Sequence, residues 1–395
     1  RPQPGGIRMS GSGAVSMTPF TVAVEQSVLD DLGARLERVR WPTAPRDAGW
    51  SYGTNPNYMK LLVEYWRTAY DWRAWERRIN AFEQHLVTID DQVIHDLVDR
   101  AAEPKALSLV LTHGWPGSII EFLEIAPMLA HPERFGGAGK DAFTVVMPSL
   151  PGYGFSGPPA EPVSPQALAP IGHRLMRDAL GFSHYVAHGS DWGAVVTSHL
   201  GLQQPDGLRA IHLTGGALSA AWKLAGQPPT QEEAAYLEAL RRKTEGETGY
   251  QAVQGTRPMT LSYGLTDSPV GLAAWIVEKY RAWTDREGDD PPFALDTLIA
   301  IIMLHWLPGP GPPTWMYRFL LDGSALALPE GETVETPTGI CSFPQDYGPP
   351  APESWIRRSY NLQHRTIASG GGHFPGLERG AELVADLRRF FAAYR

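Results

Sequence analysis

The amino-acid sequence predicts an α/β fold, with a mostly parallel central sheet flanked by helices, a helical insertion and an N-terminal extension. Three observations in the 395 residues support this prediction. From Leu107 onward, short apolar runs alternate with helical patterns, which is typical of a parallel sheet covered on both faces. Strand patterns stop after Gly216 and return only at Thr338, so a helical segment interrupts the sheet. Before Leu107 lies a stretch that is dense in aromatic and charged residues.

These changes in pattern divide the chain into five consecutive segments. The first, Arg1–Met17, is rich in small residues and has neither periodicity nor an apolar run, so we interpret it as a tag or a disordered leader. The expected segments are this leader at 1–17, an N-terminal domain at 18–104, the first part of the core at 105–216, a helical lid at 217–330 and the second part of the core at 331–395.

The N-terminal domain is expected to be mainly helical. The apolar spacing of Gln26–Arg40 predicts a helix, with Ser27 as its N-cap. Trp41 and Pro42 end this helix, because the residue before a proline avoids helical backbone. Farther along, Asn57–Phe82 predicts one or two amphipathic helices, and Gln84–Ile94 alternates like a strand.

The core and the lid are predicted from the same two periodicities. The expected strands are Leu107–Thr112, Phe143–Met147, a strand ending at Tyr185–Ala187, Ala210–Leu213, Thr338–Phe343 and Arg365–Ser369. The expected helices are Ile119–Leu129, Pro165–Leu180 and Ala194–Gln203 in the core, Gln231–Lys243, Val270–Trp283, Leu295–Trp306 and Thr314–Leu321 in the lid, and Glu382–Tyr394 at the end.

The composition excludes several classes of protein. Hydrophobic residues make up 43% of the chain and charged residues 19%, so a sizeable core is available. The net charge of −9 argues against nucleic-acid binding. The single cysteine, Cys341, excludes an intramolecular disulfide and argues against a cysteine-based metal site. No run of about 18 apolar residues predicts a membrane span. Only six of the 34 basic residues are lysines, a usage associated with GC-rich bacterial genomes.

The strongest local signal for chemistry is the stretch Tyr185–Gly193, in which a strand runs through Gly189 into a helix. This is the Gly-x-nucleophile-x-Gly elbow of α/β-hydrolases, whose glycines permit the tight turn that exposes the central side chain. Here the central residue is Asp191, whereas Ser190 comes one position too early. A carboxylate nucleophile forms a covalent ester with an electrophilic carbon, which suits opening of an epoxide or displacement of a halide. The alternative is that Asp191 only caps the following helix.

A second signal is the sequence His113-Gly-Trp-Pro-Gly117, directly after the predicted strand Leu107–Thr112. In this architecture a backbone N–H after that strand pairs with the N–H that follows the nucleophile to form an oxyanion hole. The candidates are the N–H groups of Trp115 and Trp192. An ordinary glycine-proline turn is the alternative interpretation.

The third signal is Gly370–Phe374, a glycine-rich loop between a predicted strand and the last helix. Of the 12 histidines, His373 is singled out by this loop and by its place in the chain, and it is the candidate general base. Asp346, after an earlier strand, is the candidate acid that orients it. The order Asp191, Asp346, His373 is the order of nucleophile, acid and histidine in α/β-hydrolases.

Longer motifs carry a family resemblance over nearly everything after Thr18. The chain resembles the microsomal-type epoxide hydrolases of the α/β-hydrolase superfamily, the group that includes the juvenile hormone epoxide hydrolases. The motifs of the core and lid are HGWPGS (113–118), PGYGFS (151–156), GSDWG (189–193), DSPVGLAAWIVEKY (267–280) and GGHF (371–374). The N-terminal part resembles that family's own N-terminal domain through RWP (40–42), WSYG (50–53), YW (65–66) and YDWR (70–73).

The resemblance implies that the chain opens epoxides to vicinal diols with Asp191 as nucleophile, His373 as base and Asp346 as its partner. Some relatives have glutamate at that acid position. Two lid tyrosines of the family donate hydrogen bonds to the epoxide oxygen, and Tyr250 and Tyr317 match them. A phenol, whose ordinary pKa is about 10, is a better proton source than water. Tyr263 and Tyr280 are the nearest competing tyrosines, and a core role is the alternative for each.

Further expectations complete this interpretation. The substrate pocket is expected to include Trp115, Pro116, Phe155, Trp192 and Phe374, and a lid rich in Trp, Pro and Leu favours an apolar or aromatic epoxide. Epoxide and water are the expected partners, with no metal or organic cofactor, nucleic acid or membrane anchor. We expect a soluble, cytoplasmic bacterial enzyme that can form a homodimer. Its composition is compatible with a role in antibiotic or other natural-product biosynthesis.

Two other functions remain open at the level of the sequence. A haloalkane dehalogenase also uses an aspartate nucleophile on this fold, and Trp275, Trp283, Trp306 and Trp315 could supply halide-binding N–H groups. The placement of the tyrosines and the N-terminal domain favour the epoxide. A non-catalytic binding protein of the same fold usually lacks a member of the triad, whereas all three candidates are present here.

Overall fold

The computed structural model describes residues 13–395 except 216–217, 221–222 and 225, and within them nine strands form one sheet. Their order across the sheet is β1-β2-β3-β5-β4-β6-β7-β8-β9. The neighbouring pairs β5–β4, β4–β6, β6–β7, β7–β8 and β8–β9 are parallel. The pairs β1–β2, β2–β3 and β3–β5 are antiparallel. The strands are β1 (Val15–Pro19), β2 (Glu83–Ile89), β3 (Gln92–Asp99), β4 (Leu107–Thr112), β5 (Phe143–Pro148), β6 (Tyr185–Gly189), β7 (Leu208–Leu213), β8 (Val334–Ser342) and β9 (Tyr360–Ile367).

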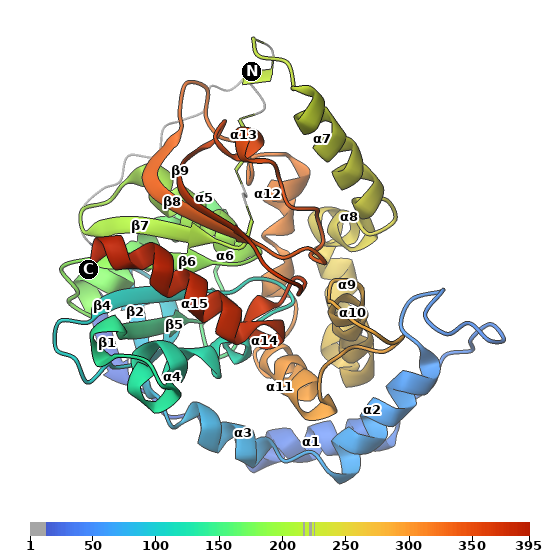
Figure 1. The fold of residues 1–395 in the computed structure, drawn as a ribbon. Coiled ribbons are helices and arrows are strands. Elements are labelled where there is room, and N and C mark those ends of the chain that lie inside the picture. Colours follow the sequence, from blue (N-terminus) through green and yellow to red (C-terminus); the bar gives the residue numbers. More distant parts are fainter. Residues whose placement is uncertain (1–12, 216–217, 221–222, 225) are drawn as a thin grey trace.

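Helices cover both faces of this sheet, which confirms the predicted fold class. In Figure 1, α4 and α15 lie in front of the sheet, and α5 and α6 lie behind it. The helices of the core are α4 (Ile125–Ala130), α5 (Pro165–Arg174), α6 (Trp192–Gln203), α13 (Glu353–Ile356), α14 (Pro375–Glu378) and α15 (Gly380–Phe391). The central strands are fully buried, so each is a continuous apolar run rather than an alternating one.

A helical insert separates β7 from β8, as the sequence predicts. We use the word insert for residues 214–333. Its helices stand beside the edge of the sheet in Figure 1. They are α7 (Gln231–Thr244), α8 (Gly249–Thr256), α9 (Pro258–Asp267), α10 (Pro269–Ala282), α11 (Leu295–Trp306) and α12 (Tyr317–Leu321). The sequence patterns missed α8 and α9, two short helices that each contain glycine.

The N-terminal helices form an arm that wraps around the insert, drawn in blue in Figure 1. They are α1 (Gln26–Glu37), α2 (Pro56–Thr68) and α3 (Trp72–Ile79), and α1 and α2 contact α10. Trp75 of α3 donates a hydrogen bond of 2.8 Å to Asp296 of α11. Arg35 of α1 pairs with Asp267 at the end of α9. The arm therefore holds the outer side of the insert.

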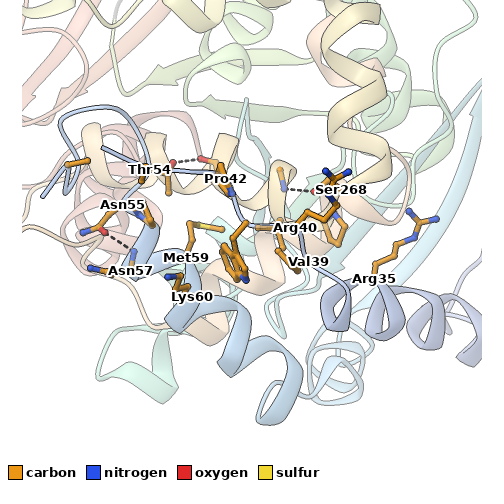
Figure 2. A pocket seen from close by; sticks show the side chains of 18 of the residues that line it. Arg35, Val39, Arg40, Pro42, Thr54, Asn55, Asn57, Met59, Lys60 and Ser268 are labelled. Atoms are coloured by element: carbon orange, nitrogen blue, oxygen red, sulfur yellow. Dashed lines mark hydrogen bonds between the residues drawn. The ribbon is translucent and has the colours of Figure 1, made fainter. Parts of the chain in front are cut away.

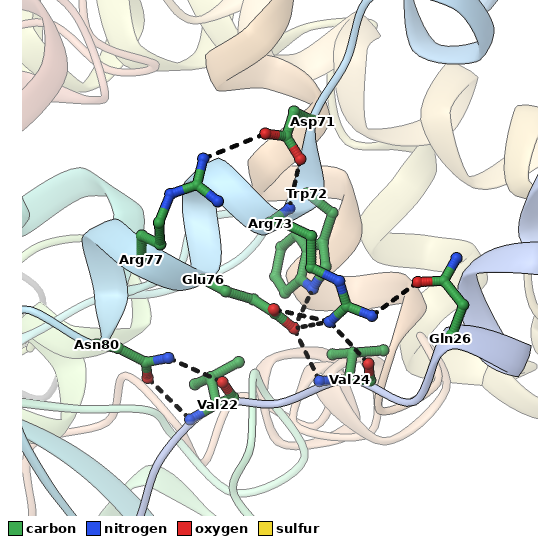
Figure 3. A network of polar contacts seen from close by, with 9 residues as sticks. All are labelled: Val22, Val24, Gln26, Asp71, Trp72, Arg73, Glu76, Arg77 and Asn80. Atoms are coloured by element: carbon green, nitrogen blue, oxygen red, sulfur yellow. Dashed lines mark hydrogen bonds and ion pairs between the residues drawn. The ribbon is translucent and has the colours of Figure 1, made fainter.

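A buried carboxylate ties the first residues of this arm to α3 (Figure 3). Glu76 accepts hydrogen bonds from the backbone N–H of Val24 and the indole N–H of Trp72, both at 2.8 Å, and it pairs with Arg73. Asn80 bonds the backbone N–H and carbonyl of Val22 at 2.9 and 2.8 Å. These contacts satisfy backbone hydrogen-bonding groups of the extended segment that leads into α1.

Several expectations for the N-terminal part need correction. Residues 1–12 lie outside the described residues, but Val15–Met17 belong to β1 and pair with β2, so the leader does not extend to Met17. The expected strand Gln84–Ile94 is a hairpin of two strands, because Asp90 adopts a positive φ of 55° and turns the chain. Both strands join the central sheet. The N-cap of α1 is Glu25 rather than Ser27, and the helix ends at Glu37.

Candidate functional site

The elbow after β6 has the geometry that its glycines predict. Asp191 adopts φ 52° and ψ −127°, a conformation that side chains rarely take and that α6 and β6 hold on either side. Gly193 leaves room for β4, since a Cβ there would lie 1.9 Å from the Thr112 carbonyl oxygen. A Cβ on Gly189 would lie 2.1 Å from the Gly193 carbonyl oxygen. Any side chain at either glycine would therefore displace the turn that presents Asp191.

The three residues predicted to form a triad lie together at the carboxyl ends of the parallel strands. They follow β6, β8 and β9 in turn, whose carboxyl ends meet there because these strands are parallel. His373 Nδ1 lies 2.6 Å from Asp346 Oδ1, and His373 Nε2 lies 3.1 Å from Asp191 Oδ2. The imidazole thus bridges two carboxylates.

These carboxylates decide the charge of the imidazole. Burial by itself lowers the pKa of His373, but the negative charges and hydrogen bonds of Asp346 and Asp191 outweigh it and hold the pKa well above its ordinary value. In the free protein the two carboxylates therefore favour the protonated imidazole.

The N–H groups predicted to form the oxyanion hole lie beside Oδ1, the other oxygen of the Asp191 carboxylate. The backbone N–H of Trp115 donates a hydrogen bond of 2.8 Å to Asp191 Oδ1. Trp192 is the first residue of α6, and its N–H is among those without a partner inside the helix. A Cβ on Gly114 would lie 2.1 Å from Asp191 Oδ1 and 2.5 Å from the Trp192 nitrogen, so Gly114 keeps this corner open.

A cavity of about 330 Å³ opens above the triad, between the core and the insert. Its lining includes Asp191, His373 and Asp346, together with both predicted tyrosines, Tyr250 of α8 and Tyr317 of α12. Aromatic and apolar side chains form most of the remaining wall: Trp192, Val195, Tyr236, Leu240, Trp283, Leu320, Leu326, Phe343, Tyr347 and Ile356.

The two tyrosines face the nucleophile from the insert. Their ring centroids are 5.6 Å apart, and Tyr317 lies edge-on to Trp192 at 5.1 Å. Burial, with a contribution from the charge of Asp191, raises the pKa of both phenols above the ordinary value. Both hydroxyls therefore stay protonated and able to donate. The competing tyrosines lie elsewhere: Tyr263 is 76% exposed, and Tyr280 is buried in a stack with Phe374.

Four of the five expected pocket residues do not line this cavity, although Trp192 does. The Trp115 ring stacks behind Tyr250 at 5.2 Å, and the Pro116 carbonyl accepts a hydrogen bond from His305 of α11. Phe374 packs edge-on against His373 and stacks on Tyr280. Phe155 packs against Phe20 and His95, next to the N-terminal arm. The first three support the site from behind, and Phe155 lies apart from it.

The sequence patterns did not identify several other residues around the site. Gln251, next to Tyr250, donates hydrogen bonds to the hydroxyls of Tyr250 and Tyr347. The ammonium of Lys279 lies 4.7 Å from the Tyr250 ring centroid. Glu121 is 3% exposed beside Asp191 and His373, and burial raises the pKa of its carboxyl to about 8. Lys279 belongs to the motif at residues 267–280, but nothing in that motif singles out its side chain. Gln251 and Glu121 belong to no pattern that sequence reasoning could separate from ordinary surface or core positions.

A second cavity, of about 910 Å³, lies between the N-terminal arm and the insert (Figure 2). Residues of the loop between α1 and α2, such as Arg40 and Pro42, line it together with Met59 of α2 and Ser268. None of the predicted site residues is among its lining residues. The described part of the chain also gathers no group of three or more His, Cys, Asp or Glu side chains placed to bind a metal ion. Among the described helices, none is both long and apolar enough to span a bilayer.

Comparisons with known proteins agree on one family. Residues 17–122 match the family model described as epoxide hydrolase N terminus, and residues 108–247 match the alpha/beta hydrolase fold. The chain is 39% identical over 382 residues, 96% of its length, to a provisionally named epoxide hydrolase of Stigmatella aurantiaca (strain DW4/3-1), of which it covers 86%. It is 31% identical to epoxide hydrolase 1 of Sus scrofa, covering 98% of this chain and 90% of that protein.

Solved structures give the same result. The Aspergillus niger epoxide hydrolase superposes with a TM-score of 0.81 at 30% identity, covering 97% of both chains. The juvenile hormone epoxide hydrolase of Bombyx mori superposes with a TM-score of 0.83 at 28% identity, covering 97% of this chain and 96% of that one.

Proposed function

The chain belongs to the epoxide hydrolase family, and we propose that it opens an epoxide to a vicinal diol through a covalent ester on Asp191. The observation that carries the proposal is that the two oxygens of the Asp191 carboxylate have different partners. Oδ1 is held by the Trp115 N–H at 2.8 Å, and Oδ2 faces His373 at 3.1 Å below the cavity. Oδ2 is the attacking atom, and Oδ1 becomes the ester carbonyl oxygen.

In the first half-reaction Asp191 Oδ2 attacks one epoxide carbon, and the carbon–oxygen bond of the ring breaks. The electron pair moves to the ring oxygen, which takes a proton from Tyr250 or Tyr317. Forming the ester removes the charge of Asp191, so the pKa of His373 falls. His373 then gives up its proton, which restores the tyrosine and leaves a neutral imidazole.

In the second half-reaction neutral His373, held by Asp346, takes a proton from a water molecule that attacks the ester carbonyl carbon. The oxyanion that develops on Oδ1 is stabilised by the N–H groups of Trp115 and Trp192. When the intermediate collapses, the leaving oxygen takes the proton from His373. The Asp191 carboxylic acid then returns a proton to His373, and the resting charges are restored.

The cavity supports an apolar or aromatic epoxide as the substrate. Its volume of about 330 Å³ is at the small end of ligand pockets, and aromatic and apolar side chains form most of its wall. Polar groups of Gln251, Tyr347 and Thr214 interrupt that wall and offer hydrogen bonds to a substituent. The insert that supplies both tyrosines acts as the lid.

The test is a diol assay on the two enantiomers of styrene oxide, with wild type beside Asp191→Asn and 1-bromobutane as a halide control. We expect diol from wild type, none from Asp191→Asn, and wild-type rates from the surface variant Asp178→Asn. Halide release without diol would identify a haloalkane dehalogenase instead. Intact-protein mass spectrometry of His373→Gln should show the substrate added to Asp191. Absence of both diol and adduct would favour a binding protein.

Three finer parts of the proposal concern the cell. We propose a cytoplasmic bacterial enzyme that acts in natural-product (antibiotic) biosynthesis and assembles as a homodimer. Deletion of the gene should make an epoxide accumulate in the culture, and fractionation should place the protein in the cytoplasm. Sedimentation should give twice the mass of one chain, and the mass of a monomer would contradict the proposed homodimer.

A further inference from the structure

Four consecutive backbone N–H groups hold the loop that carries His373. The Gly371 N–H donates to Asp285 Oδ2 at 2.8 Å, and the His373 N–H donates to the Trp283 carbonyl at 2.8 Å. The N–H groups of Gly372 and Phe374 both donate to the Glu378 carboxylate, each at 2.9 Å. The acceptors alternate between the insert and Glu378, so the loop is clamped from two sides.

The Glu378 carboxylate also reaches the insert directly. Its Oε2 accepts the backbone N–H of Asp285 at 2.8 Å as well as that of Gly372. One oxygen therefore joins the segment that follows α10 to the residue before His373. Contact is close here, because a Cβ on Gly372 would lie 2.4 Å from the Trp283 carbonyl oxygen and 3.0 Å from the Asp285 nitrogen.

We propose that Glu378 is a positioning residue, whose carboxylate locks the His373 loop to the Trp283–Asp285 segment of the insert and so fixes the imidazole over the Asp191 ester. Glu378 does not touch the reacting atoms, and it acts through the backbone on both sides of His373. The inference rests on the proposed function, because it assigns Glu378 to the second half-reaction of that mechanism.

Chemistry makes this role specific to a carboxylate. Three backbone donors converge on the two oxygens of Glu378, and both oxygens are used. Glutamine has the same shape but a single acceptor oxygen, so its NH₂ group would face at least one N–H donor. The substitution keeps the size of the side chain while it replaces one of the two accepting oxygens by an NH₂ group.

The two half-reactions depend on this lock to different degrees. Ester formation needs Asp191 and the tyrosines, whereas ester hydrolysis needs His373 Nε2 within reach of the attacking water. A shift of about 1 Å in a catalytic group can cost on the order of 10²-fold in rate. Loosening the loop should therefore slow hydrolysis and leave ester formation nearly unchanged.

The experiment is single-turnover kinetics of the full-length Glu378→Gln variant with styrene oxide, following the ester by rapid quench and intact-protein mass spectrometry. We expect ester hydrolysis to slow by about 10-fold to 10²-fold and ester formation to change by less than about 3-fold. Because the ester then accumulates, kcat and KM should fall together.

Glu382→Gln is the matched control. Glu382 accepts the backbone N–H of Ser369 at 2.9 Å, which is not one of the four consecutive N–H groups of residues 371–374. This variant should leave both half-reactions unchanged. Asp285→Ala removes the acceptor of the Gly371 N–H and should slow hydrolysis in the same sense but less, which provides a second test if Glu378→Gln folds poorly.

Equal slowing of both half-reactions, or a Glu378→Gln variant that behaves like Glu382→Gln, would overturn the inference. The His373→Gln variant separates this outcome from failure of the proposed function. If His373→Gln accumulates the Asp191 ester, the mechanism stands and only the role of Glu378 is wrong. If no ester forms in that variant, the proposed mechanism itself fails.

Discussion

The Nδ1 atom of His373 lies 2.6 Å from an oxygen of Asp346, although 27 positions of sequence and the whole of β9 separate the two residues. This contact orients the ring, so that Nε2 faces Asp191, and it adds negative charge beside the imidazole. It therefore sets both the direction and the pKa of the proposed base.

Asp346→Asn should lower both the rate and the pH midpoint of ester hydrolysis. Hydrolysis needs the neutral imidazole, so its rate rises with pH through the pKa of His373. Since the Asp346 charge raises that pKa, its removal moves the midpoint to lower pH. The plateau should fall by about 10²- to 10⁴-fold, because the ring loses its partner. Hydrolysis of preformed ester measured between pH 5 and 9 checks this, and an upward shift would contradict it.

Tyr250→Phe and Tyr317→Phe should slow ester formation, because each removes a proton donor from the ring oxygen. A loss of about 10-fold to 10²-fold is expected for each, and a greater loss for the double variant. Rapid-quench measurement of ester formation checks the effect. Tyr263→Phe is the control, since this tyrosine is 76% exposed. Wild-type ester formation in both single variants would exclude the tyrosines as donors.

Glu76→Gln should destabilise the protein by loosening the N-terminal arm. The carboxylate is 7% exposed and accepts hydrogen bonds from the Val24 backbone, Trp72 and Arg73. Losing hydrogen bonds to a buried charged acceptor costs about 1.5–3 kcal/mol, which should lower the midpoint of thermal unfolding by a few degrees. Glu64→Gln, which removes an exposed pair with Arg67, should leave the midpoint unchanged. Equal midpoints for the two variants would contradict this role.

Glu121→Gln should stabilise the protein at neutral pH. Burial raises the pKa of this carboxyl to about 8, so the folded state binds a proton that the unfolded state releases above about pH 4.5. Glu121 therefore costs stability increasingly as the pH rises from about 4.5 to 8. Glutamine removes that cost, and we expect a gain of about 1–3 kcal/mol at pH 7 that vanishes near pH 4. Urea unfolding at both pH values checks the sign, and a gain that is larger at pH 4 would contradict it.

Sequence patterns were most reliable where local chemistry and local geometry coincide. The turn at Asp191 needs glycines on both sides, and the sequence supplies Gly189 and Gly193. Leu107–Thr112 and Leu295–Trp306 were predicted to the residue, because a fully buried strand and an apolar helix leave continuous local signals. Where the signal was weak, the prediction failed. The turn at Asp90 contains no glycine or proline, so the sequence pattern predicts one strand where the structure has the hairpin of β2 and β3.

Local sequence patterns specify which chemical groups are available and in what order they follow the strands, including Asp191, Asp346 and His373. They can do so because each signal depends on a few neighbouring residues. The sequence also placed Trp192 in the pocket, but it took the packing of the whole chain to show that Phe155 lies apart from the cavity and that Glu378 reaches Asp285. Such contacts join residues far apart in the chain. They depend on how the insert packs against the core, which local periodicity does not encode.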